Sequence, residues 1–73
     1  MYIITIVADR RDTIVSILKE YKPEVMPEIK ELCDCIGSGF VTSLVVYNWE
    51  DVEYIKQIAN KYDRVFVRSA GLD

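Results

Sequence analysis

The residue types best suited to chemistry lie together in the middle of the chain, where CDCIGSG occupies residues 33 to 39. Two thiolates one residue apart could bind a soft ion such as Cu(I) or form a redox pair. A structural metal site usually has four protein ligands and a catalytic site three, and the chain has no histidine to complete either set. On a helix Cys33 and Cys35 would point about 160° apart, whereas on a strand they would share a face. We expect structural roles for both, with no metal site and no cofactor.

The glycines of the same stretch, Gly37 and Gly39, suggest a phosphate-binding loop. Such a loop follows a strand and opens a helix, because the phosphate binds the free N–H groups of the first helical turn. Here the glycines follow a predicted helix and precede a predicted strand, so we expect them to end one element and begin the next. Without histidine, triads and histidine-based acid–base chemistry are also excluded. We therefore expect the protein not to be an enzyme.

A second candidate site depends on the arrangement of the strands. Asp9, Arg10 and Arg11 follow the first predicted strand, and Asp51 follows the second. If these strands are parallel, their carboxyl ends lie at one edge of the sheet, where open α/β folds bind ligands. The four residues could then bind a small anion or a phosphate group. Turn and helix-cap formation is the alternative role for most of them.

Three glutamates form the third candidate feature. Glu24, Glu28 and Glu31 fall at positions i, i+4 and i+7 of a predicted helix, where they would form an acidic ridge. The plain interpretation is a solvated surface. The sharper interpretation is a docking surface for a basic protein, since opposite charge speeds and orients association. Trp49 and Tyr54 are aromatic residues of the types found at energetic hot spots, and would supply affinity.

The composition predicts a single globular domain over residues 1–73. Apolar residues make up 51% of the chain. So short a chain has difficulty covering that much apolar surface, which leaves open its burial against a second copy in a homodimer or against a partner.

The charge and the start of the chain exclude several classes of protein. The net charge is −3, and between residues 20 and 53 acids outnumber bases by eight to two. Non-specific binding to nucleic acid or to an anionic membrane needs a basic surface, so we expect neither. The apolar stretch at the start has no basic segment before it and reads as a strand rather than a signal peptide. We expect a cytoplasmic protein with free thiols.

Hydrophobic periodicity predicts the elements that must position these residues. The stretch YIITIVA, residues 2–8, is apolar on both alternating faces, which predicts a central strand covered on both sides. Two further strands are predicted, at residues 40–47 and 64–69. Helices are predicted at residues 12–22, 24–36 and 48–62.

The order β-α-α-β-α-β predicts a small α/β protein with a three-stranded, mainly parallel sheet and helices packed on it. The alternative makes residues 28–36 a strand and IGSGF a hairpin turn. This alternative gives the β-α-β-β-α-β order of ferredoxin-like α+β folds. Helical periodicity favours the first arrangement, and chain length suits the second.

These features predict a small acidic protein-binding module, an inhibitor or regulator that occludes a basic surface of another protein. An accessory protein of a phage or mobile element is a plausible origin. The alternatives are an anion- or phosphate-binding protein that uses the strand ends, and a homo-oligomeric assembly protein. In its element order and acidic charge the chain resembles the barstar family of ribonuclease inhibitors, which have a parallel three-stranded sheet with helices. The resemblance is one of outline and not of motif.

Overall fold

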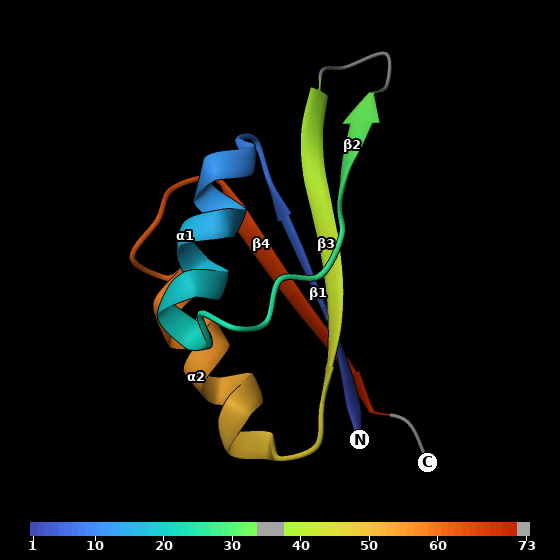
Figure 1. Ribbon diagram of the computed structural model, residues 1–73, viewed down its shortest axis with the longest axis vertical. Coiled ribbons are helices and arrows are strands. Elements are labelled where there is room, and N and C mark those ends of the chain that lie inside the picture. Colours follow the sequence, from blue (N-terminus) through green and yellow to red (C-terminus); the bar gives the residue numbers. More distant parts are fainter. Residues whose placement is uncertain (34–37, 72–73) are drawn as a thin grey trace.

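The computed structural model describes residues 1–33 and 38–71, and these form four strands and two helices (Figure 1). In chain order the elements are β1 (Tyr2–Ala8), α1 (Arg11–Tyr21), β2 (Ile29–Cys33), β3 (Ser38–Val46), α2 (Trp49–Ala59) and β4 (Val65–Gly71). The roles expected for Cys35 and Gly37 lie outside the described residues, as does the side chain of Cys33.

The strands form one sheet in the order β2-β3-β1-β4, and each neighbouring pair is antiparallel. The predicted three-stranded, mainly parallel sheet is therefore wrong, and the outline resemblance to the barstar family, which depended on it, is lost. The element order β-α-β-β-α-β is the one that the ferredoxin-like alternative described.

The difference arises in residues 24–36, which were predicted to be a helix. The part Ile29–Cys33 is instead a strand, and it pairs with β3 so that Ile29 lies opposite Thr42. The buried hydroxyl of Thr42 donates a 2.8 Å hydrogen bond to the carbonyl oxygen of Glu28, which holds the start of β2. Intrinsic helix and strand preferences differ by only about 1 kcal/mol per residue, so pairing with a neighbouring strand outweighs a short helical period.

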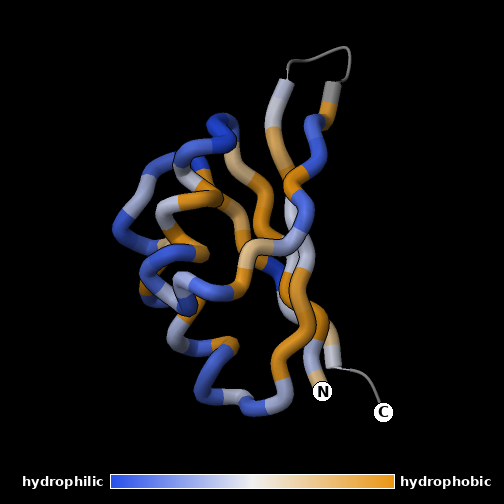
Figure 2. Tube along the Cα trace, in the orientation of Figure 1, coloured by the Kyte–Doolittle hydropathy of each residue, from blue (hydrophilic) through white to orange (hydrophobic). Residues whose placement is uncertain are grey.

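The hydrophobic core lies between the sheet and the two helices. Both helices cover the same face of the sheet, and their apolar sides turn toward it (Figures 1 and 2). In β1 the side chains of Ile4 and Ile6 point to the helices and are fully buried. The buried apolar residues are Ile4, Ile6, Ala8, Ile14, Ile17, Leu18, Tyr21, Leu44, Val46, Val52, Ile55, Ile58 and Ala59.

Candidate functional site

The face of the sheet opposite to the helices carries no helix among the described residues (Figure 1). Side chains alternate along a strand, and residues directly paired across two strands share a face. The outward-facing residues, which follow from the register and which we call the open face, are Ile3, Thr5, Val7, Lys30, Leu32, Val41, Ser43, Val45, Phe66, Arg68 and Ala70. The sequence predicted a first strand covered on both sides, and the fold covers it on one.

Most of the open face is apolar. Phe66 is 70% exposed, Val45 46% and Leu32 45%, while Ile3 and Val7 are partly buried between their neighbours. Soluble monomers rarely leave contiguous apolar patches of large area uncovered, and such patches usually mark interaction sites. The open face therefore has the chemistry of a docking surface.

Polar side chains cross the middle of the open face in one row. Thr5 lies between Ser43 of β3 and Arg68 of β4, and the Thr5 and Ser43 hydroxyl oxygens are 3.5 Å apart. Arg68 is exposed and forms no ion pair with any residue in the described part of the chain. The row thus carries one free positive charge at the β4 side.

The other side of the open face carries a charge of each sign. Glu28, directly before β2, and Lys30 of β2 are exposed and line a hollow of about 230 Å³ together with Val41 and Ser43. Glu28 therefore lies beside the polar row, at the β2 edge of the face. Of the three glutamates singled out in the sequence, Glu28 is the one that borders the open face.

The prediction of an acidic ridge is wrong, because the helix that would align the three glutamates does not form. Glu24 lies in the turn after α1, Glu28 in the segment before β2, and Glu31 within β2 opposite Phe40. Since side chains alternate along a strand, Glu28 and Glu31 project to opposite faces. All three are exposed, but they do not form a line of charge.

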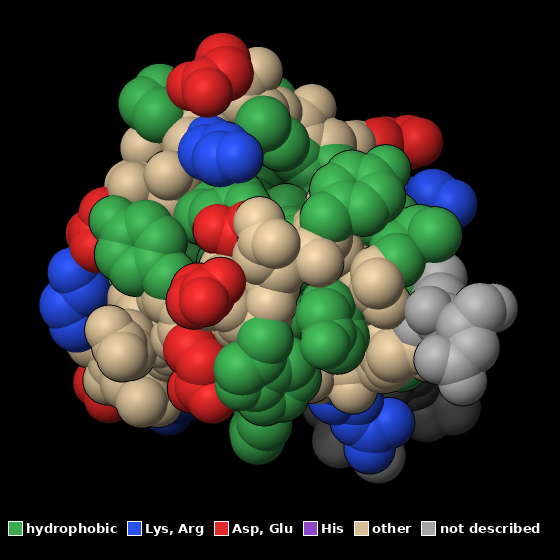
Figure 3. Space-filling model, turned by 90° about the horizontal axis from the view of Figure 1, so that it is seen from below, with side chains coloured by type: hydrophobic (Ala, Val, Ile, Leu, Met, Phe, Trp, Pro, Cys, Tyr) green, Lys and Arg blue, Asp and Glu red, His purple; other side chains and the backbone are tan. Residues whose placement is uncertain are grey.

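Trp49 begins α2 and is 47% exposed. Its ring packs edge-on against Tyr2, with 5.4 Å between ring centroids, and the Lys56 ammonium group lies 5.5 Å from the Trp49 ring centroid. Figure 3 views this end of the molecule, where acidic side chains stand close together with hydrophobic side chains exposed beside them. Trp49 is thus partly used in packing α2 onto the sheet, away from the open face.

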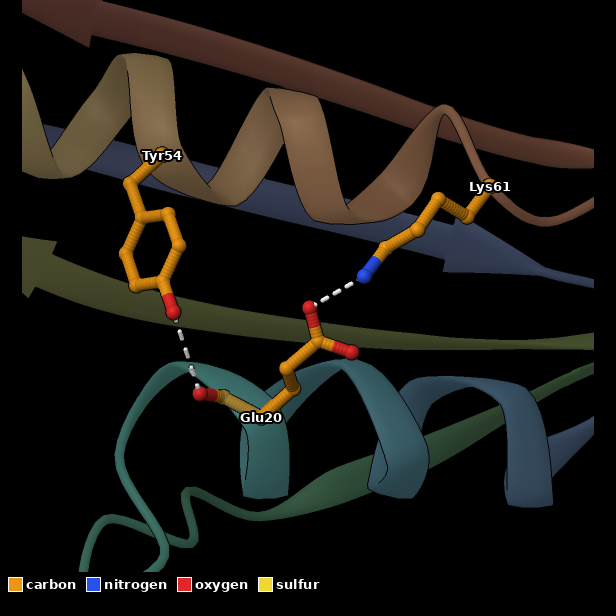
Figure 4. A network of polar contacts seen from close by, with 3 residues as sticks. All are labelled: Glu20, Tyr54 and Lys61. Carbon is orange, nitrogen blue, oxygen red and sulfur yellow. Dashed lines mark hydrogen bonds and ion pairs between the residues drawn. The ribbon is translucent and has the colours of Figure 1, made fainter.

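Tyr54 belongs to a contact between the two helices. Its hydroxyl donates to the Glu20 carbonyl oxygen at 3.5 Å, its ring lies 6.1 Å from that of Tyr21, and Lys61 forms an ion pair with the Glu20 carboxylate (Figure 4). Exposed ion pairs typically contribute at most about 1 kcal/mol. The group joins the end of α1 to α2, so part of the Tyr54 side chain is engaged inside the molecule.

This helix contact predicts a loss of stability in alkali. Burial, and then the negative charge of Asp51, raises the pKa of Tyr21 above 10.0, and the hydrogen bond to Glu20 raises the pKa of Lys61 above 10.5. Both groups hold their protons more tightly when folded, so their contribution is complete below pH 10 and is lost as pH rises through the folded-state values. We expect urea denaturation to give a free energy of unfolding that falls above about pH 10. Tyr21→Phe should flatten this fall, and an unchanged slope would contradict the assignment to Tyr21.

The strand-end site is not assembled, because β1 and β3 run in opposite directions. Asp9, Arg10 and Arg11 lie where β1 ends, whereas Asp51 lies in the first turn of α2, at the other end of the sheet (Figure 1). The Asp9 carboxylate is 3.6 Å from a guanidinium nitrogen of Arg64, which enters β4 with a left-handed φ of 58°. Arg10 and Arg11 line a shallow hollow of about 330 Å³. The structure therefore separates Asp51 from the other three.

Within residues 1–33 and 38–71 no group of three or more Cys, Asp or Glu side chains is placed to hold a metal ion. In the same residues no helix is long and apolar enough to cross a membrane. Comparison with protein-family models, with curated proteins and with solved structures gave no match.

Sequence reasoning did not select the open face as a site. The available signal was the apolar character of both faces of residues 2–8, together with alternation around Phe66 and Arg68. A parallel sheet with helices on both faces would cover such a strand on both sides, and this is the arrangement that the sequence predicts. In an antiparallel sheet with both helices on one side, the same pattern leaves an apolar face with no helix over it among the described residues.

Proposed function

We propose that this chain is a small non-enzymatic protein-binding module that binds its partner through the open face of the sheet. The observation that carries the proposal is the set of exposed apolar side chains on both sides of the polar row, among them Phe66 and Val45, which the fold leaves uncovered. Valine, isoleucine and phenylalanine side chains are complementary to another apolar protein surface, and aromatic residues at the centre of such contacts often dominate the binding energy.

The chemistry of the face also defines the partner. The basic partner expected from the sequence rested on the acidic ridge, which does not form. The open face instead offers Arg68 and Lys30, with Glu28 at its border. A complementary surface has apolar side chains on both sides of a polar row, and charges of both signs at its edges. As an inhibitor or regulator the module would act by occupying such a surface. Its location would be the cytoplasm, which the small number of cysteines favours.

Nucleic acid fits this face less well than protein. Sheets that bind single strands place several aromatic side chains where successive bases can stack on them. Phe66 is the one aromatic residue among the open-face residues defined above, and the remaining central positions are valine, isoleucine, threonine and serine. The proposal therefore names a protein partner.

Capture from a lysate of the native host tests the proposal. The immobilised chain is compared with Phe66→Glu, which replaces the exposed ring on β4 with a charge, and with Gln57→Glu, which adds the same charge at an exposed position of α2. We expect Phe66→Glu to lower specific capture about ten-fold or more and Gln57→Glu to leave it unchanged. Equal capture by all three proteins, or no specific capture by the unmodified chain, would contradict the proposal.

A further inference from the structure

We infer that the occupant of the open face is a second copy of this chain, with the two sheets packed face to face about a two-fold axis parallel to the strands. This inference rests on the proposed use of the open face and names its partner. Its support is the distribution of charge across the open face. With the axis parallel to the strands, opposite charges of the two copies meet, whereas with the axis across the strands like charges meet.

The axis determines which strands meet. A two-fold axis that runs along the strands, between β1 and β3, places β4 of one copy over β2 of the other and β1 over β3. Each residue keeps its height along the strand direction. The packing of two sheets with their strands within about 30° of each other and about 10 Å apart is the common aligned arrangement.

At the height of the polar row this symmetry pairs opposite charges. Arg68 lies at the β4 end of the row that also holds Thr5 and Ser43. Glu28 precedes Ile29, which pairs with Thr42, and shares a hollow with Ser43, so it lies at the β2 end of the same row. Arg68 of one copy therefore faces Glu28 of the second copy, and the contact occurs twice. The two long side chains together can span the gap between aligned sheets.

The next row toward the end of β1 gives a second matched contact. Lys30 lies opposite Val41, and Val7 lies between Val41 and Phe66. The same symmetry places Lys30 over the exposed ring of Phe66 of the second copy and Val7 over Val41. An ammonium group over an aromatic face is attractive, and the two valines bury apolar surface.

The other simple arrangement, with the two-fold axis across the strands at the height of the polar row, is disfavoured by charge. It places each strand over its own copy, so that Arg68 faces Arg68 and Glu28 faces Glu28. Like charges brought together at an interface are costly and prevent wrong pairings. The register of the sheet thus selects one of the two orientations.

The size of the face limits the strength of the dimer. Four strands about 4.8 Å apart and about seven residues long present roughly 450 Å² per copy, or roughly 900 Å² for the pair. This is at the lower limit of specific interfaces, so we expect a weak dimer. The chain exposes 5164 Å², about 500 Å² more than an average monomer of its mass.

Sedimentation equilibrium of the purified full chain, from about 10 µM to about 1 mM, tests the inference. We expect a reversible shift toward twice the mass of the chain, and amide chemical-shift changes on dilution that map to the open face. Phe66→Lys, which removes the ring and brings a like charge opposite Lys30 of the second copy, should abolish the shift, while Gln57→Lys at an exposed position of α2 should retain it. A monomer up to the highest concentration would overturn the inference.

Charge reversal tests the orientation. Arg68→Glu alone places two glutamates together, and Glu28→Arg alone places two arginines together, so each should weaken the dimer about ten-fold. The double variant Glu28→Arg/Arg68→Glu should restore it, as should an equimolar mixture of the two single variants. Single variants that dimerise as well as the unmodified chain would overturn the proposed axis. Circular dichroism checks that each variant is folded, and both positions are exposed.

These measurements separate the inference from the proposed function. A chain that stays monomeric but captures a partner through Phe66 retains the protein-binding function and loses the dimer. A chain that dimerises through the open face but captures nothing from the lysate is an assembly protein, and the proposal of a different partner is then wrong.

Discussion

Replacing Ile6 with alanine is expected to lower the free energy of unfolding by about 2–5 kcal/mol, because it deletes three buried carbon atoms and leaves a cavity. Ile6 is fully buried in β1, a central strand, and belongs to the core between the sheet and the helices. A domain of this size has a total stability of only about 4–11 kcal/mol, so the variant would lose a large part of the stability of the chain. Urea denaturation followed by circular dichroism measures the change.

The matched control is the next residue of the same strand. Val7 lies on the open face and is partly exposed, so Val7→Ala should lower the free energy of unfolding by less than about 1 kcal/mol when the chain is dilute. The contrast between two neighbours measures how differently the two faces of the sheet are covered. Losses of equal size would show that the open face is buried within the monomer, and would remove the basis of the docking proposals.

Thr42→Val is expected to be the most damaging substitution of a polar side chain, with a loss of about 1–3 kcal/mol. The Thr42 side chain is 2% exposed, and its hydroxyl donates to the Glu28 carbonyl oxygen at 2.8 Å. Valine has nearly the same shape, so the variant removes the donor and leaves the carbonyl without this partner. Hydrogen exchange should show faster exchange of the β2 amides, and denaturation should show the loss of stability.

Thr42→Ser is the control for this prediction. Serine keeps the hydroxyl and loses one methyl group, so it should retain the protection of β2 and lower the free energy of unfolding by about 1 kcal/mol. If Thr42→Ser and Thr42→Val expose β2 to exchange equally, the hydrogen bond does not hold Glu28 and the start of β2 in place.

The sequence predicts most of the elements and misses their arrangement because of one segment. The strand expected at residues 2–8 matches β1, and the helix expected at 12–22 matches α1 within one residue at each end. Residues 2–8 are almost continuously apolar, which predicts a buried strand, and residues 12–22 carry an unbroken period of 3.6 residues. Ile29–Cys33 carries neither pattern, since Glu31 faces the helix side without being buried there. This segment is a strand because it pairs with β3, and intrinsic strand propensity does not predict such a pairing.

The formation of β2 also decides which of the predicted sites the structure assembles. Adding one strand between α1 and β3 reverses the direction of β3, which moves Asp51 to the opposite end of the sheet from Asp9. It also removes the helix that aligned Glu24 and Glu31. Glu28 remains near a candidate surface because its carbonyl group is held by Thr42. The open face exists because both helices pack on the same side of the sheet. That arrangement depends on the whole fold and cannot be predicted from any single stretch of the sequence.

The strand order has a consequence for how the chain folds. The first half of the chain supplies β1 and β2, and the second half supplies β3 and β4, yet the order in the sheet is β2-β3-β1-β4. Every ladder therefore joins a strand of one half to a strand of the other, and neither half contains a strand pair of its own. A half made alone would have only unpaired strand edges and a single helix, too little to bury a core. Because strands of the two halves alternate across the sheet, we expect the two halves to unfold together in a single cooperative step.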